Sequence, residues 1–392
     1  MASTETAAPD DLFGADLYAA LGGAGNLVFS PASIGTALRM TLVGARGETA
    51  GQLAATLRLA KPQDAAGGLL ETCALLDSLA AGDLTLRAPN TVWVQSGLPL
   101  QPDFTAALAQ AACAQLRAAD FIEASGPARQ QINDLIAEQT AGKITGLIPP
   151  GAISAATRLV LASAVYLKAA WTYPFPPGAT QDAPFHPAPG TGQLVPTMRL
   201  RQRLRYLRGD GYQVVELPYT GQRLGMVIVL PDGPLAPVES RLTGDGLGGL
   251  LAGLATRQVI LALPRFRVTG QFSLGTALAA LGMPLAFTSR ADFTGITTAQ
   301  PVHISDVVHQ AYLDVAEQGT EAAAATAVVV RAAARVMMPD PPVELIVDRP
   351  FLFAITELAS GLPLFLGRVT NPAELTRGAP PGPPMPAGPN IN

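Results

Sequence analysis

The chain has 392 residues, of which 48% are hydrophobic and 14% are charged, so it can bury a substantial core as one large mixed domain or as several smaller ones. Its formal net charge of -4 does not favour a surface for nucleic acid or for an anionic membrane. No apolar run approaches the length that spans a bilayer.

Residues 1–10 are polar and acidic, and we expect them to be flexible. They lack the basic start and the apolar block of a signal peptide. Two alternatives remain open for the location: the protein is cytoplasmic, or the chain lacks its leader.

The first half of the chain alternates between helical periodicity and short β-rich runs. Ser30 and Pro31 suit a helix start, because serine caps a helix and proline fits its first turn. We expect helices at residues 11–21, 31–43, 47–57, 69–80, 104–116 and 127–139, and strands at 26–29, 85–95 and 159–167.

Cys73 and Cys113 are the two cysteines of the chain. Two cysteines cannot build a framework of several disulfides, and their spacing matches no metal-ligand motif. We predict that both are buried small apolar side chains rather than a disulfide or a nucleophile. No metal or cofactor site is predicted.

The second half is richer in strands, and its Pro-rich segment at 174–189 is expected to be a loop. Strands are expected at 198–207, 224–230, 259–263, 265–268, 307–315, 343–347, 351–357 and 364–368, with a helix at 273–281. Strands and helices mix without βαβ regularity, so the predicted fold class is α+β. The Pro-rich end, residues 373–392, is expected to be disordered.

Arginines alternate along the predicted strand at 198–207, at positions 199, 201, 203 and 205. Under a period of two they share one side of the strand. A polyanion-binding patch is one interpretation, and the solvated face of an edge strand is the favoured one.

The segment from Glu317 to Ala334 is composed mostly of small residues. In a strand, Thr320, Ala322 and Ala324 would make one uncharged face, with Glu321 on the other. An alanine-rich helix or surface loop is the alternative. The β-branched run 328–330 and the prolines at 339–342 favour an extended segment that buries one face.

Six motifs, in the expected order over residues 11–372, resemble the serpin family. They are residues 26–34 (NLVFSPASI), 131–133 with 142–144 (QIN and GKI), 291–296 (ADFTGI), 308–311 (VHQA), 317–322 (EQGTEA), and 349–353 with 365–372 (RPFLF and FLGRVTNP). The resemblance implies a single serpin domain at 11–372, with three β-sheets, about nine helices and an exposed reactive-centre loop.

The resemblance also implies the function of a suicide inhibitor of serine endopeptidases, and not of an enzyme. A peptidase attacks the loop, the cut loop inserts into the main sheet as a new strand, and the acyl-enzyme is trapped as a covalent 1:1 complex with a monomeric inhibitor. No nucleic acid or membrane partner is implied. The resemblance leaves an extracellular location open.

The implied hinge of the loop consists of Glu317, Gly319, Thr320, Glu321, Ala322, Ala323, Ala324 and Ala325. The family's spacing from Glu317 puts the reactive bond at Ala333–Ala334, which suits elastase-like or subtilisin-like enzymes. Arg335 and Arg331 are the alternatives, and they would suit a trypsin-like enzyme.

Five further residues match family positions in the main sheet. Ser30, Ser33, Ser163 and His309 resemble the polar cluster, called the shutter, that lets the strands part. The family commonly has asparagine at the position of Ser163, so the change either shortens a hydrogen bond or requires a water. Trp171 resembles the tryptophan of the breach, where insertion begins.

Three other functional classes have less support from the sequence than a serpin inhibitor. A Ser-His-Asp hydrolase lacks support, because the chain has no Gly-x-Ser-x-Gly elbow and only three histidines, at positions 186, 303 and 309. A non-inhibitory serpin, acting as chaperone, carrier or storage protein, is disfavoured by the alanine hinge. A polyanion-activated inhibitor is not supported by the helix at 69–80, which has no basic residue.

Overall fold

The computed structural model describes residues 8–80, 84–321 and 341–374. Within them lie eight α-helices: α1 (Pro9–Leu21), α2 (Pro31–Val43), α3 (Gly47–Thr56), α4 (Asp64–Ala80), α5 (Pro102–Ala109), α6 (Ser125–Gln139), α7 (Ala236–Leu251) and α8 (Gly275–Ala280). The helix α7 is interrupted at Gly246, where φ is 73°. The α+β class is confirmed, with about the number of helices expected.

The strands of the described residues are β1 (Leu27–Phe29), β2 (Thr85–Arg87), β3 (Asn90–Gln95), β4 (Ala114–Ala119), β5 (Leu159–Ala170), β6 (Gln181–Phe185), β7 (Gln193–Arg208), β8 (Tyr212–Pro218), β9 (Leu224–Pro231), β10 (Ala255–Pro264), β11 (Phe266–Ser273), β12 (Asp306–Ala316), β13 (Gly319–Thr320), β14 (Val343–Ile346), β15 (Phe351–Glu357) and β16 (Pro363–Val369).

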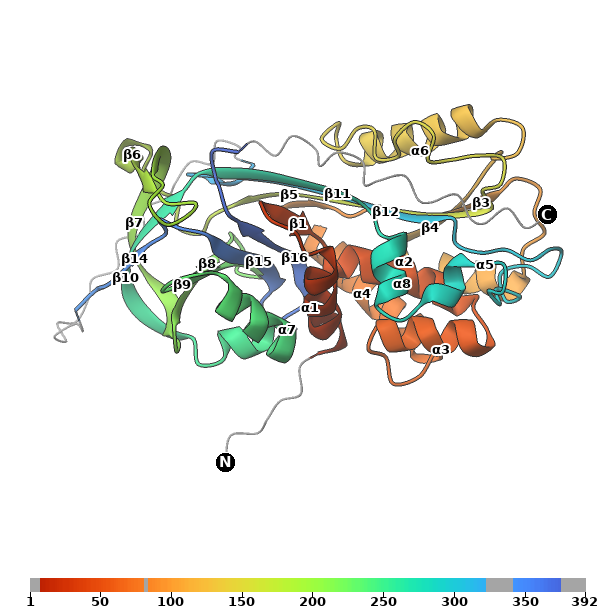
Figure 1. Ribbon diagram of the computed structural model, residues 1–392, viewed down its shortest axis with the longest axis horizontal. Coiled ribbons are helices and arrows are strands. Elements are labelled where there is room, and N and C mark those ends of the chain that lie inside the picture. Colours follow the sequence, from red (N-terminus) through yellow and green to blue (C-terminus); the bar gives the residue numbers. More distant parts are fainter. Residues whose placement is uncertain (1–7, 81–83, 322–340, 375–392) are drawn as a thin grey trace.

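The main sheet has the strand order β11-β12-β13-β5-β3-β4, with β2 paired to the end of β5. Helix α6 covers one face of this sheet, and α2, α3, α4, α5 and α8 lie on the other side (Figure 1). Its central strand β5 is buried on both faces along most of its length, which explains its continuous apolar sequence.

The remaining strands form one network in the order β1-β16-β15-β9-β8-β7-β10-β14, with β6 attached to β7. The 16-residue β7 pairs with β6 and β10 along most of its length and with β8 at its end. Hydrogen bonding among the described residues therefore joins two of the three expected sheets through one long strand. Within the described part of the chain, residues 198–204 of β7 pair only with β10, so this stretch has one free edge, and its arginine face is solvated, as expected.

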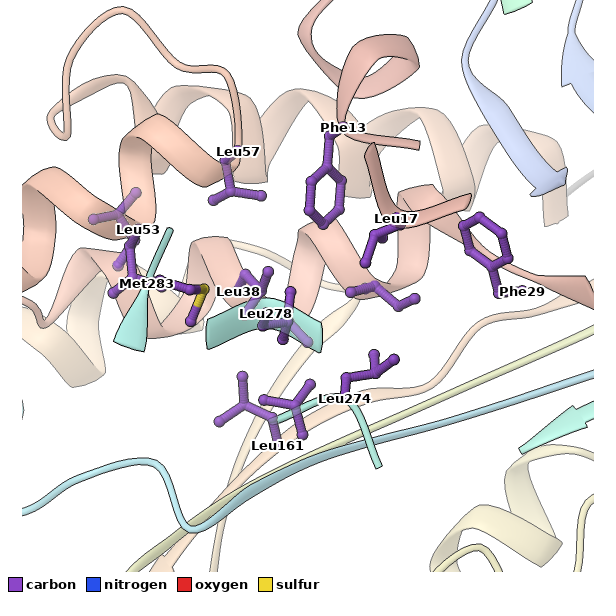
Figure 2. Packing of buried hydrophobic residues seen from close by; sticks show 14 of the residues in the cluster. Phe13, Leu17, Phe29, Leu38, Leu53, Leu57, Leu161, Leu274, Leu278 and Met283 are labelled. Carbon is purple, nitrogen blue, oxygen red and sulfur yellow. The ribbon is translucent and has the colours of Figure 1, made fainter. Parts of the chain in front are cut away.

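Apolar side chains below the main sheet form a core that joins the helices to β5. Figure 2 shows Leu161 of β5 close to Leu274 and Leu278, with Leu38 of α2 nearby. A second core fills the space between the main sheet and the β7 to β16 network, and a smaller one lies under α6 around Trp93. The main sheet is thus packed on both faces.

Local chemistry accounts for the start of α2. The hydroxyl of Ser30 accepts a hydrogen bond from the backbone N–H of Ser33 at 3.1 Å, and Pro31 occupies the first turn, as predicted. Helix α1 begins at Pro9, two residues before its predicted start.

Tertiary pairing overrides local propensity between α5 and α6. The predicted helix at 104–116 ends at Ala109, and residues 114–119 form β4, which pairs in parallel with β3. Strands β6 and β8 and helix α7 were not predicted, and β6 falls inside the expected loop at 174–189.

The prediction for the cysteines is wrong. Cys73 of α4 and Cys113, just before β4, form a disulfide with their Cα atoms 5.1 Å apart. Because the two residues are 40 positions apart, only the folded chain brings them together. The bond fastens α4 to the edge of the main sheet.

Candidate functional site

The candidate site is the junction between β5 and β12, the two central strands of the main sheet. They pair in parallel from Val160 with Asp306 to Tyr166 with Tyr312. Beyond this point β13 lies between them, antiparallel to both, with Thr320 opposite Ala169 on one side and Val315 on the other. Strands β5 and β12 are therefore paired directly along most of the junction, and at its end they are separated by β13.

The first residue of β13 has to be glycine. Gly319 adopts a φ of 149°, which side-chain-bearing residues rarely adopt. A Cβ atom there would lie 2.0 Å from the carbonyl oxygen of Ala169. The absence of a side chain at Gly319 therefore lets the hinge enter the sheet.

Thr320 is fully buried next to an aromatic pair. Its Oγ1 lies 2.5 Å from the hydroxyl of Tyr219, whose ring stacks on Trp171 with centroids 4.4 Å apart. The indole Nε1 of Trp171 donates to the carbonyl of Ala316 at 2.9 Å, and its backbone N–H donates to the carbonyl of Gln318 at 2.9 Å. The proposed breach residue thus holds both the end of β12 and the start of the hinge.

Glu317 anchors the chain just before β13. Burial alone would raise its pKa, but hydrogen bonds from Arg265 and Thr180 hold the pKa of this carboxyl below its usual value. The Nε of Arg265 donates at 2.8 Å and the hydroxyl of Thr180 at 2.5 Å. The carboxylate stays ionised and ties the hinge to the junction between β10 and β11 and to the segment before β6.

Glu321, the last described residue before position 341, is tied to the segment after α6. It forms an ion pair with Lys143 and adopts a φ of 47°. Burial, and then a hydrogen bond with Glu321, raise the pKa of Tyr166. Lys143 belongs to the Gly-Lys-Ile motif, to which the sequence analysis assigned no contact.

The four residues predicted for the shutter do lie together beneath the junction. The backbone N–H of Ser30 donates to Nε2 of His309 at 3.0 Å, and Nδ1 of His309 lies 2.8 Å from Oγ of Ser163. Burial lowers the pKa of His309 to about 3, so the ring is neutral at pH 7. Because Nε2 accepts, the proton is on Nδ1, which donates to Ser163.

Ser163, which stands where the family commonly has asparagine, lies in direct hydrogen-bond contact with His309. An asparagine nevertheless lies one strand away: Asn90 of β3 is paired with Ser163, and its Oδ1 accepts from Ser33 at 2.7 Å. Asn90 lies in the middle of the strand expected at 85–95, and the sequence analysis did not connect it to the site.

This serine–histidine contact is no catalytic pair. Ser163 and His309 are both fully buried, and a histidine with a pKa of about 3 is a poor general base at neutral pH. In the part of the chain that the structure describes, no group of three acidic, cysteine or histidine side chains is placed to hold a metal ion. No helix among those same residues is long and apolar enough to cross a bilayer.

The rest of the predicted hinge, Ala322 to Ala325, lies outside the described residues, as do Arg331, Ala333, Ala334 and Arg335. The residues that the sequence analysis did not connect to the site are Tyr219, Thr180, Arg265, Lys143 and Asn90, each of which contacts a predicted site residue.

Comparisons with known proteins cover almost the whole chain. The family model for serpins, described as serine protease inhibitors, matches residues 10–372. A serpin-like protein of Thermococcus kodakarensis is 37% identical over 362 residues, which are 92% of this chain and 84% of the relative. The leukocyte elastase inhibitor of Sus scrofa is 36% identical over 381 residues, which are 94% of this chain and 100% of the relative.

Solved structures agree with the sequence relatives. Serpin48 of the insect Tenebrio molitor superposes with a TM-score of 0.82 at 31% identity, covering 93% of this chain and 97% of that one. Human thyroxine-binding globulin, solved as a complex with its ligand, superposes with a TM-score of 0.81 at 28% identity, covering 93% and 98%.

Proposed function

The chain belongs to the serpin family, and from this premise we propose that it is a suicide inhibitor of serine endopeptidases, with elastase-like or subtilisin-like enzymes as its targets. The peptidase serine attacks a loop peptide bond and forms an acyl-enzyme with the new C-terminus. The cut segment then inserts between β5 and β12 and carries the enzyme with it before water can hydrolyse the ester. The inhibitor acts as a monomer in a 1:1 complex.

One observation carries this proposal: β13 lies between β5 and β12 and is antiparallel to both. A strand that continues from β13 would replace one parallel ladder by two antiparallel ladders, which are slightly more stable per residue. About twelve inserted residues, each gaining a net ~0.5–1.5 kcal/mol hydrogen bond, would contribute ~6–18 kcal/mol before the entropy of ordering is subtracted. That gross gain is of the order of the stability of a whole domain, which supports insertion as the step that deforms a bound enzyme.

The hinge sequence supports fast insertion. Thr320 is buried in the sheet, and the next residues on the same face of a continuing strand would be Ala322 and Ala324. Neither is charged or bulky, so a continuing strand would meet little steric resistance.

The proposed reactive bond is Ala333–Ala334, which has small side chains on both sides. The leukocyte elastase inhibitors that resemble this chain support an elastase-like target. Cleavage after Arg335 or Arg331, by a trypsin-like enzyme, is the alternative specificity. A non-inhibitory carrier is the alternative function, since the fold also matches a thyroxine-binding globulin solved with its ligand.

Incubation with elastase, subtilisin and trypsin separates these alternatives. We expect a 1:1 adduct that survives boiling in detergent with elastase or subtilisin, and a released C-terminal peptide that begins at Ala334 by mass spectrometry. A trypsin adduct with a peptide beginning at Val336 or Ala332 would move the bond to Arg335 or Arg331. Cleavage by all three enzymes without any adduct would support the non-inhibitory alternative.

A further inference from the structure

The outer face of β7, β10 and β14 carries a group of arginines that the inhibitory mechanism does not use. Arg199, Arg201 and Arg203 of β7 are exposed and alternate with the half-buried Leu200 and Gln202. At about 6.7 Å for every two residues, they form a regular row along the strand. Figure 1 places these strands at the end of the molecule opposite α3 and α5.

The three guanidinium groups have no ion-pair partner among residues 8–80, 84–321 and 341–374. The next arginine in the row, Arg205, differs because it is paired with Glu216 at 2.9 Å. Three unpaired positive charges are thus gathered on one face of a protein whose net charge is -4. Such segregation creates a local positive potential.

Glu344 of β14 is an acidic residue on the same face as the arginine row. Arg201 is opposite Ile260 of β10, which is in turn opposite Glu344 of β14. Two strand spacings separate the backbones of Arg201 and Glu344 by about 9.6 Å. Among the described residues, no ion pair joins Glu344 to an arginine of this row.

Apolar side chains lie beside the arginines on the same face. Ile346 of β14 is 47% exposed and is paired with Ala262, which is opposite Arg199. Ile260 is half-buried between Arg201 and Glu344. A row of positive charge next to exposed isoleucine suits a protein surface better than a polyelectrolyte, because a polyanion has no apolar groups to bury against Ile346.

The arginine face lies close in the chain to the proposed reactive bond, which indicates the target peptidase as its partner. Strand β14 begins at Val343, nine residues after Ala334, so at most about 30 Å of extended chain separates it from the proposed reactive bond. This distance matches the diameter of a small domain, so an enzyme held at that bond reaches the edge of the sheet. Strand β14 is at this edge, β10 is next to it, and β7, which carries the arginines, follows.

We propose that Arg199, Arg201 and Arg203, together with Ile346, form an exosite that binds an acidic patch on the target peptidase next to its active-site cleft. This inference rests on the proposed inhibitory function. The exosite raises the rate of encounter and orients the enzyme over the loop, whereas the later insertion step does not depend on it. Peptidases with the same cleavage preference but a basic surface would be inhibited more slowly.

A triple variant tests the exosite: Arg199→Ala, Arg201→Ala and Arg203→Ala. Its matched control is Arg87→Ala, Arg117→Ala and Arg290→Ala, three exposed arginines outside the face. Both variants lose three positive charges, which takes the net charge from -4 to -7 in each case. The peptidase is the one that gives the boiling-resistant adduct with the unmodified protein.

We expect the exosite variant to associate about tenfold more slowly than the unmodified protein at low ionic strength, with the difference shrinking in high salt. The control should associate at the unmodified rate. The number of inhibitor molecules consumed per enzyme should be the same in all three proteins, because insertion is unaffected. Binding to a peptidase whose catalytic serine is replaced by alanine should weaken by the same factor.

Equal association rates for the three proteins, with adducts still formed, would overturn the exosite and leave the inhibitory function standing. Absence of any adduct with the unmodified protein would overturn the function itself, and the exosite with it. Inorganic polyphosphate tests whether the face binds a polyanion instead of the peptidase. If it accelerates inhibition by the unmodified protein and by the control but not by the exosite variant, the face binds a polyanion and the peptidase assignment is wrong.

Discussion

The hydroxyl of Thr320 lies 2.5 Å from the hydroxyl of Tyr219, so the first residues of the proposed inserting segment are already inside the main sheet. Burial keeps the pKa of Tyr219 above its ordinary value, and the phenol stays protonated. In the proposed mechanism, insertion would therefore start from a strand that is already paired, rather than from a free loop.

Replacing Thr320 tests this starting point. Thr320→Arg would bury a charge beside Tyr219, so insertion should slow and the protein should become a substrate instead of an inhibitor. The measurement is the fraction of cleaved protein without adduct on a denaturing gel. Thr243→Arg, at an exposed site on α7, is the control and should inhibit normally. Unchanged inhibition by Thr320→Arg would remove the hinge assignment.

Gly319 should tolerate no side chain. Gly319→Ala would place a Cβ atom 2.0 Å from a backbone carbonyl, so β13 has to leave the sheet. We expect a lower melting temperature, a loss of about 1–3 kcal/mol, and altered tryptophan fluorescence from Trp171. Gly126→Ala, where no atom lies within 4 Å, is the control. Equal melting of the two variants would contradict the described hinge geometry.

The buried His309 should make stability depend on pH. Its pKa is about 3 in the fold and 6.5 ordinarily, so the unfolded chain binds the proton more readily. The stabilisation is complete above pH 6.5 and is lost progressively as the pH falls toward 3. At pH 5 the expected loss is about 2 kcal/mol.

Thermal melts of the unmodified protein and of His309→Gln between pH 5 and pH 7.5 measure this effect. The variant should be less stable at neutral pH, yet its melting temperature should fall less on acidification. The same slope in both proteins would show that other groups control the acid response.

The disulfide between Cys73 and Cys113 should contribute measurably to stability. Closing a loop of 40 residues stabilises a fold by about 3–4 kcal/mol in the chain-entropy model. The double variant Cys73→Ser, Cys113→Ser should therefore unfold at a lower denaturant concentration than the oxidised protein. Thiol titration of the unreduced, unfolded chain should detect no free thiol, and two thiols per chain would refute the bond.

The hinge and shutter predictions came from short family motifs, such as those that contain Gly319 and His309, and their roles stay predictions. Contacts between residues distant in sequence could not be predicted from local motifs. Examples are the hydrogen bond of Asn90 with Ser33 and the ion pair of Lys143 with Glu321. The same holds for β4, whose helix-like composition is overridden by pairing with β3.

The central claim is that the uncleaved protein stores free energy that strand insertion releases. The most direct test compares the melting temperature of the intact protein with that of the protein cut in the loop by a peptidase. Because insertion replaces one parallel ladder by two antiparallel ladders, the cut form should melt well above the intact form. If both forms melt at the same temperature, no insertion has taken place and the proposed mechanism is wrong.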